Sequence, residues 1–152
     1  MEDQDLKFMK MAFDEAKAAA SEGEIPVGAV VVCKGMVIAR AHNLTETLTD
    51  VTAHAEMQAI TAAASYLGGK YLDECTLYVT LEPCTMCAGA IGWSQLKRLV
   101  YGASDPKRGY STPGKRRKSV PAIRFPEKRT GSCAGCPPVA AIHFAACRPA
   151  PR

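Results

Sequence analysis

The sequence predicts an α/β fold in which helices pack on a β-sheet. Three observations lead to this prediction: an amphipathic helical pattern near the N-terminus, two β-branched runs joined by a short turn, and a further alternation of helical and strand patterns up to residue 103. Strand–helix–strand units cross over in a right-handed sense, which places their helices on the sheet. The chain has 152 residues, a length that fits one domain with its own core.

The N-terminal elements follow from periodicity. Residues 5–20 carry apolar side chains at three- and four-residue steps among good helix formers, which predicts a helix that ends at Gly23. Residues 27–33 and 36–41 are rich in β-branched residues and are separated by Lys34 and Gly35. A two-residue turn of this kind predicts a β-hairpin, with glycine taking a positive φ.

The later elements follow from their boundary signals. After a polar loop over 42–52, Thr52 is expected to cap a helix over 53–67 that stops at Gly68. Residues 75–81 predict a third strand, and residues 97–103 a fourth. Pro83 suits the first turn of a helix over 84–96 that lies between these strands.

Composition favours an ordinary soluble protein of the cytoplasm. Hydrophobic residues make up 47% and charged residues 22% of the chain, and no apolar run approaches the roughly 20 residues of a membrane span. The N-terminus is acidic and lacks the apolar region of a signal peptide. The seven cysteines are odd in number, which favours reduced thiols and metal ligation over a disulfide framework.

Charge divides the chain into two parts. Residues 1–106 hold 8 Lys and Arg against 14 Asp and Glu, whereas residues 107–152 hold 11 against one. Eight of the ten prolines lie in residues 106–152, and the regular patterns stop near Ser111. This basic tail can hold nucleic acid electrostatically, or it can be a solvated segment without a partner.

Four residues form the pattern that carries chemistry: His54, Glu56, Cys84 and Cys87. Cys84 and Cys87 are three residues apart and share one helix face. His54 and Glu56 are two apart, and both can reach an ion beyond the end of a helix if they lie in its first turn. Two thiolates and an imidazole leave the fourth position of Zn²⁺ open, which is the pattern of a catalytic site.

In such a site Glu56 is free to carry protons between the water, the ring nitrogen and the leaving amine. The alternative is a closed structural site with a fourth protein ligand, which leaves Glu56 without a role. The sequences His54-Ala55-Glu56 and Pro83-Cys84-Thr85-Met86-Cys87 together resemble the His-x-Glu and Pro-Cys-x-x-Cys signature of zinc nucleobase deaminases.

The surrounding segments resemble the bacterial tRNA-specific adenosine deaminases of the cytidine/deoxycytidylate deaminase superfamily, over residues 5–110. The matching stretches are GEIPVGAVVV, HN, TAHAEM, TLYVTLEPCTMCAGAI and VYGASDPKRG. The resemblance implies a three-layer α/β/α cytidine-deaminase-like fold with a central mixed sheet. It also implies a homodimer, one Zn²⁺ per subunit, and conversion of adenosine to inosine at the wobble position of a tRNA anticodon stem-loop.

The resemblance also implies roles for individual residues. His54, Cys84 and Cys87 are expected to bind zinc, and Glu56 to be the proton shuttle. The expected substrate-binding residues are Asn43 on the purine, Ala55 and Pro83 through their backbone, Ile25 and Val27 along the base, and Asp105 and Lys107 at the RNA-facing rim. A loop base suits this reaction because a stacked adenine cannot reach a buried metal, whereas a splayed base is extruded at low cost.

The tail departs from the family pattern. Members of the family continue into a further strand and a basic amphipathic helix, and neither is evident here. We therefore expect a deaminase domain over 1–110, an irregular tail over 111–152, and a sheet that lacks an edge strand. The tail resembles either a coding region read in a shifted frame or a divergent natural sequence.

Several other features have two interpretations each. Cys133, Cys136, His143 and Cys147 suggest either a second zinc knuckle or unordered residues, and residues 115–118 either phosphate contacts or a solvated basic run. Cys33 and Cys75 are expected in the core. His42 lines the mouth of the site or has a structural role, and Trp93 serves core or dimer packing or stacks on a base.

Three functions compete. The first is deamination of tRNA adenosine, and the second is deamination of a free base or nucleoside such as guanine or cytosine. The third is an inactive zinc-binding product with an altered C-terminus. The first two share zinc and Glu56 and differ in the size of the substrate.

Overall fold

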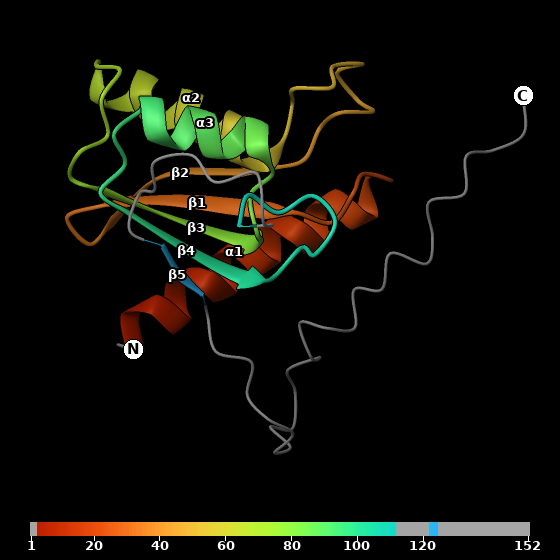
Figure 1. The fold of residues 1–152 in the computed structure, drawn as a ribbon, viewed down its shortest axis with the longest axis horizontal. Helices are drawn as coiled ribbons and strands as arrows, with labels where there is room; N and C mark the ends of the chain where they lie inside the picture. Colours follow the sequence, from red (N-terminus) through yellow and green to blue (C-terminus); the bar gives the residue numbers. More distant parts are fainter. Residues whose placement is uncertain (1–2, 112–121, 125–152) are drawn as a thin grey trace, which may run out of the picture.

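The computed structural model describes residues 3–111 and 122–124. A five-stranded sheet has the order β2-β1-β3-β4-β5, with α2 and α3 on one face and α1 on the other (Figure 1). The strands are β1 (Gly28–Cys33), β2 (Met36–His42), β3 (Cys75–Leu81), β4 (Arg98–Ala103) and β5 (Ala122–Arg124), and the helices α1 (Asp3–Ser21), α2 (Ala55–Leu67) and α3 (Thr85–Trp93). The predicted three-layer α/β/α fold is confirmed.

The sheet is mixed, as expected. β1 pairs antiparallel with both β2 and β3, whereas β3–β4 and β4–β5 are parallel. The predicted hairpin is present, and Lys34 and Gly35 both adopt positive φ at its turn. None of the helices in the described ranges is long and apolar enough to cross a membrane.

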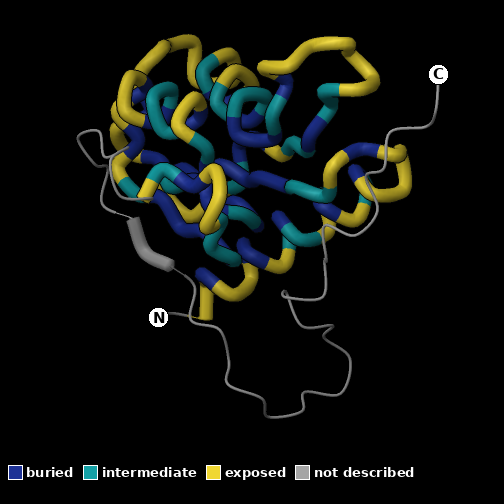
Figure 2. Tube along the Cα trace, turned by 45° about the vertical axis from the view of Figure 1, so that its right-hand side comes forward, coloured by how far each residue is buried: buried dark blue, intermediate teal, exposed yellow. Residues whose placement is uncertain are grey.

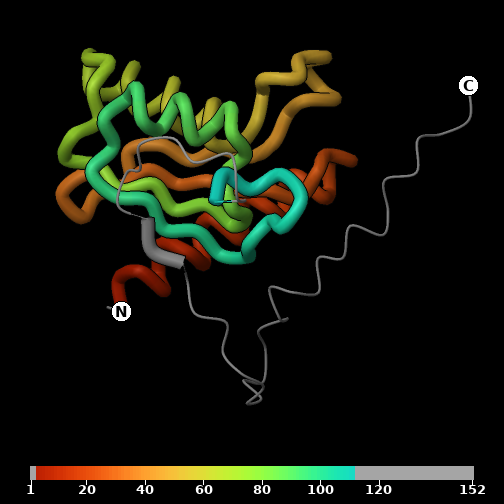
Figure 3. Tube along the Cα trace, in the orientation of Figure 1, coloured from red at the N-terminus to blue at the C-terminus, as the bar shows by residue number. Residues whose placement is uncertain are grey.

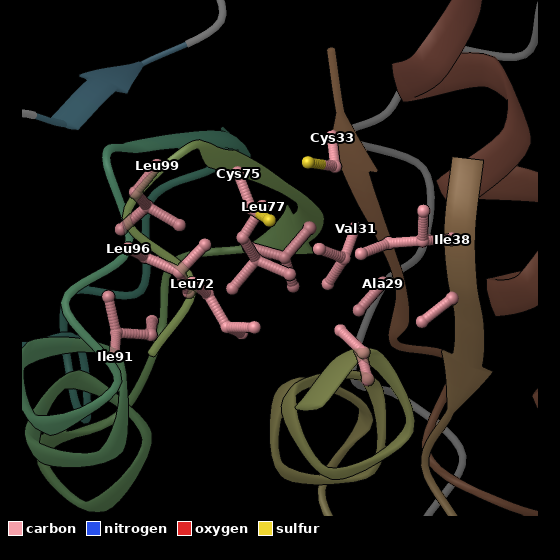
Figure 4. Close-up of a cluster of buried hydrophobic side chains, with 14 of the residues drawn as sticks. Ala29, Val31, Cys33, Ile38, Leu72, Cys75, Leu77, Ile91, Leu96 and Leu99 are labelled. Carbon is pink, nitrogen blue, oxygen red and sulfur yellow. The ribbon is translucent and has the colours of Figure 1, made fainter. Parts of the chain in front are cut away.

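Two apolar layers hold the helices on the sheet. Beneath α2 and α3 lies a cluster that includes Val31, Leu72, Leu77 and Leu99 (Figure 4). On the opposite face Phe8 and other residues of α1 pack on Val30, Tyr78 and Val100. The chain is accordingly buried along the central strands and exposed at the loops (Figure 2). Cys33 and Cys75 belong to the first cluster, so the expectation that they are core residues is confirmed.

The close approach of α1 to β1 depends on small residues. Ala12 and Ala16 are fully buried in α1, and they face Gly28 at the start of β1. A Cβ atom at Gly28 would collide with the backbone of both alanines. The alanine-rich pattern that predicted this helix therefore also sets its distance from the sheet.

Two helix boundaries differ from the prediction. Helix α2 begins at Ala55 with His54 as N-cap, because the hydroxyl of Thr52 donates to Asp50 instead of capping the helix. Helix α3 has Cys84 as its N-cap, so Pro83 precedes the helix and does not form its first turn. It ends at Trp93, ahead of Gln95, which adopts a positive φ.

The expected lack of an edge strand is wrong. The short strand β5 adds to the sheet, with Leu99 opposite Ala122 and Tyr101 opposite Arg124. Its three residues are too few for a periodic pattern to reveal, and pairing with β4 is what defines them. The cysteines and histidine of the possible zinc knuckle, and the basic run 115–118, lie outside the described residues.

Candidate active site

Sheet topology brings the predicted site residues to one edge. Because β2 and β3 are both antiparallel to β1, they run in the same direction, as does β4. The ends of these three strands and the start of β1 therefore lie at the same edge, and α2 and α3 both begin there (Figure 3). Every segment that carries a predicted site residue either enters or leaves the sheet at this edge.

Three side chains form a compact group at the N-termini of the two helices. His54 is the N-cap of α2, Cys84 is the N-cap of α3, and Cys87 lies in the first turn of α3. Their ligand atoms all lie within 4.8 Å of one another. The Nδ1 atom of His54 is 3.7 Å from Sγ of Cys84 and 3.5 Å from Sγ of Cys87.

These distances fit a zinc ion. With Zn–S bonds of about 2.3 Å and a Zn–N bond of about 2.05 Å, tetrahedral geometry separates sulfur from nitrogen by about 3.6 Å. The observed separations agree with that value, and the described residues supply three ligands to the group. The donor set and its spacing therefore suit a zinc site with one position left for another ligand.

The thiols differ in their surroundings. A hydrogen bond with Cys87 lowers the pKa of Cys84 to about 5, and the adjacent N-terminus of α3 favours the same negative charge. The pKa of Cys87 is raised by its hydrogen bond with Cys84 and by burial. The opposite shifts mean that Cys84 loses its proton more readily than Cys87, and a divalent cation favours the loss of both protons.

Glu56 lies in the first turn of α2, two residues after His54, and only 3% of its surface is exposed. Burial raises the pKa of its carboxyl to about 7. A carboxyl that titrates near neutral pH can both accept and release a proton, which is what a proton shuttle requires.

The loop after β2 lies against the start of α2. Asn43 is buried, and its backbone N–H donates to the carbonyl of Val27. The N–H of Leu44 donates to the carbonyl of Ala53, which directly precedes His54. Asn43, Val27 and fully buried Ala55 are thereby brought together with the ligand group, and Ile25, two residues before Val27, is 37% exposed.

The loop after β4 lies beside Cys84. The N–H of Tyr110 donates to the carbonyl of Pro83, and Cys84 pairs with Gly109 in an isolated antiparallel β-bridge. Asp105 folds this loop by accepting the backbone N–H groups of Lys107 and Arg108. Lys107 is exposed, which is compatible with the rim position expected from the sequence.

Two buried glutamates at this edge were not predicted as site residues. Glu24 accepts hydrogen bonds from the loop after β2, and Glu82 accepts them from Asp105 and Ser111 in the loop after β4. Glu24 lies two residues before Pro26 in the stretch GEIPV, which leads into β1, and Glu82 lies directly before Pro83 in the stretch TLEPC, which follows β3. An acidic residue in such a setting is the signal that sequence reasoning missed.

His42 and Trp93 had two interpretations each. The imidazole of His42 lies between Glu15 at 3.0 Å and Glu22 at 3.1 Å. Burial lowers its pKa, but the hydrogen bonds to Glu15 and Glu22 outweigh that effect and raise it. This ion pairing gives His42 the structural role.

Trp93 is 84% exposed, so the expectation of core packing is wrong for the described part of the chain.

Comparison with known proteins agrees with this geometry. Residues 2–103 match the family model of the cytidine and deoxycytidylate deaminase zinc-binding region. The tRNA-specific adenosine deaminase of Bacillus subtilis strain 168 is 55% identical over 108 residues, which cover 71% of this chain and 67% of that protein.

Solved structures give the same result. One structure comes from a study of A-to-I editing by tRNA:A34 deaminases at the wobble position of transfer RNA. It is 44% identical to this chain, with a TM-score of 0.75, and the match covers 78% of this chain and 91% of that chain. The guanine deaminase of Bacillus subtilis is 42% identical, with a TM-score of 0.64 over 68% of this chain and 66% of its own.

Proposed function

Because the chain belongs to the cytidine and deoxycytidylate deaminase zinc-binding family, we propose that it deaminates adenosine to inosine at the wobble position of a tRNA anticodon by hydrolysis. The observation that carries the proposal is the group of His54, Cys84 and Cys87 with buried Glu56 beside it. The 55% identity to a tRNA-specific adenosine deaminase supports the substrate.

In this proposal His54, Cys84 and Cys87 hold one zinc ion per subunit. Zinc, when bound, lowers the pKa of a water molecule enough to make it a nucleophile near neutral pH. Glu56 would take one proton from the attacking water and give it to the ring nitrogen. After the hydroxyl has added to the ring carbon, Glu56 would take the hydroxyl proton and give it to the amine, which leaves as ammonia. Its burial supports this role, because bulk water is kept from the carboxyl that must exchange the proton with the substrate.

The remaining site residues hold the base and the RNA. Asn43, the backbones of Ala55 and Pro83, and the side chains of Ile25 and Val27 bind the extruded adenine. Asp105 and Lys107 lie at the rim, where neighbouring nucleotides of the anticodon loop pass. A loop base reaches such a site more readily than a stacked one because less stacking must be broken.

We also propose that the protein is a homodimer joined through the outer face of α3. This helix contains no charged residue, and its buried residues are Cys87 and Ile91 alone. Met86 and Trp93 expose 37% and 84% of their surfaces on it. An apolar helix that lies outside the sheet with a half-exposed surface suits burial against a second copy of itself.

The test is inosine formation. Zinc-loaded protein is incubated with an anticodon stem-loop carrying a wobble adenosine, and with adenosine, cytidine, guanine and cytosine as separate substrates. The nucleotide products are then analysed by mass. We expect inosine from the stem-loop only.

The matched control is Glu56→Gln, which keeps the shape of the side chain and the zinc but removes the proton carrier. We expect it to lose activity by at least about a hundredfold. Turnover of guanine or cytosine in place of the stem-loop would assign the protein to the small-substrate deaminases instead. Zinc-loaded protein that deaminates none of these substrates would contradict the proposal altogether.

A further inference from the structure

Glu24 is a buried carboxylate at the end of the sheet where the site residues lie. It lies between α1 and β1 and is 5% exposed, and among the described residues its side chain accepts hydrogen bonds only from the segment that follows β2. Its partners there are the side chains of Asn43 at 3.0 Å and Thr45 at 3.5 Å and the backbone N–H groups of Glu46 at 3.2 Å and Thr47 at 2.7 Å.

No cation neutralises this carboxylate within residues 3–111 and 122–124, where the ion pairs of the structure involve other acidic groups. Burial raises the pKa of Glu24, but the hydrogen bonds from Thr47, Glu46 and Asn43 outweigh it and lower the pKa. The carboxylate is therefore charged and held by donors alone. Such an arrangement imposes one geometry on those donors, because each loses a charge-assisted bond when it moves.

The geometry decides which way the Asn43 amide faces. Its Nδ2 group donates to Glu24 and also to the hydroxyl of Thr45 at 3.0 Å. A carboxylate accepts and never donates, so the NH2 end of the amide must point toward Glu24. The opposite atom, Oδ1, accepts no hydrogen bond from the described residues, and it is not among their buried unpartnered atoms. Oδ1 is thus the atom of this amide that has no protein donor within the described residues.

We propose that Glu24 is a positioning residue that orients the side-chain amide of Asn43 and so fixes which of its atoms the substrate base meets. This rests on the proposed function, in which Asn43 contacts the base. With glutamate at 24, the base meets the acceptor Oδ1. With a group at 24 that can donate, the amide can turn over and offer NH2 instead, so the base would meet a donor in place of an acceptor.

The test is an exchange of donor and acceptor between the two positions. Glu24→Gln introduces a donor, and Asn43→Asp removes one. Together they restore a single donor–acceptor pair with an acceptor oxygen at 43 still facing the base. We measure kcat and KM for inosine formation on the anticodon stem-loop, with zinc content and Tm for each variant. The control is Glu74→Gln, which removes an exposed carboxylate paired with Lys34.

We expect each single substitution to raise KM by about tenfold or more, as for the loss of a hydrogen bond to a charged group, with kcat changed less. The double variant should be more active than either single variant, and Glu74→Gln should match the wild type. If KM of the double variant rises by the product of the two factors measured for the single variants, the two positions act independently and the proposal is overturned. A Glu24→Gln protein with wild-type KM would also overturn it.

Two further measurements keep the inference separate from the proposed function. If the wild type makes no inosine, the proposed function fails. The exchange experiment is then run on whichever base the wild type deaminates, and amide hydrogen exchange of Glu46 and Thr47 is compared in the wild type and Glu24→Gln. Unchanged protection of both Glu46 and Thr47 would overturn the role of Glu24, because the two N–H groups bond to different oxygens of the carboxylate and a glutamine has only one acceptor oxygen. If Glu24→Gln does not fold, Glu24→Asp, which withdraws the same carboxylate by one carbon, must show the rise in KM.

Discussion

At the scale of single residues, the site depends on groups whose charge is set by their neighbours. Burial raises the pKa of Glu56 to about 7, whereas a hydrogen bond with Cys87 lowers the pKa of Cys84 to about 5 at the start of α3. The first property suits proton transfer and the second suits cation binding. The raised pKa of Glu56 arises from burial and the lowered pKa of Cys84 from its hydrogen bond with Cys87, and neither residue type has these properties in solution.

Cys84→Ala tests the assignment of the metal ligands. Removing one of three ligands should lower the zinc content well below one per subunit and lower Tm, since metal binding contributes to folding stability. Metal content by mass spectrometry and thermal unfolding with and without a chelator provide the measurements. Cys33→Ala is the control, because it removes a buried thiol far from the helix N-termini. Full zinc content in Cys84→Ala would show that this residue is not a ligand.

At the scale of elements, α1 is fastened to the sheet by an ionic contact as well as by its apolar face. Asp5 in the first turn accepts hydrogen bonds from the Arg98 guanidinium at 2.8 and 2.7 Å and from the Tyr78 hydroxyl at 2.7 Å. These partners lie on β4 and β3, so one carboxylate links three elements. The Arg98 hydrogen bond, opposed by burial and aided by Tyr78, lowers the pKa of Asp5 below 3.8.

Asp5→Asn should therefore destabilise the fold in a pH-dependent way. The pKa of Asp5 is lower in the folded than in the unfolded protein, so its contribution is fully present above pH 3.8 and is lost as pH falls through the folded value. At pH 7 we expect a loss of about 1–3 kcal/mol in the free energy of unfolding, and a smaller difference from the wild type below pH 4.

Denaturant unfolding at several pH values measures this effect. Asp14→Asn is the matched control, because Asp14 lies on the same helix and pairs with Lys17 at an exposed position. That exposed pair should contribute little. Equal destabilisation by the two substitutions, or a loss that does not depend on pH, would contradict the role given to Asp5.

At the scale of the whole molecule, the layers formed by the described residues leave an apolar surface exposed on the outer side of α3. Helix α1 is packed on one face of the sheet and α2 and α3 on the other, so the outer side of α3 faces away from the core. The residues that it exposes, Met86 and Trp93, are large and apolar. The proposed homodimer would cover them without changing the site residues on the opposite side of the helix.

Trp93→Glu should accordingly give a monomer. A buried charge on each side of a two-fold interface is repelled by its copy and loses its hydration. Sedimentation equilibrium of zinc-loaded protein measures the mass, and zinc content shows that the site is intact. Val51→Glu is the control because Val51 is also 84% exposed but lies in a loop. A dimer that persists in Trp93→Glu would exclude this face as the interface.

The sequence by itself determined the elements and the chemical group. Periodicity and residue composition located α1 and the hairpin, and boundary signals and composition located α2, β3 and β4, because all of these patterns are local. The spacing of His54, Glu56, Cys84 and Cys87 predicted the metal group, since its two halves are each confined to one helical turn. These properties are short-range, so they can be seen without knowing how the chain folds.

The tertiary structure alone decided how those parts meet. The direction of β2 relative to β3 brings the starts of α2 and α3 together, and the pairing of β4 with a three-residue strand completes the sheet. Glu24 and Glu82 became recognisable only when their donors, which lie about 20 to 30 residues away in the chain, were in place. A buried carboxylate is defined by its surroundings, and those surroundings come from strand register and packing.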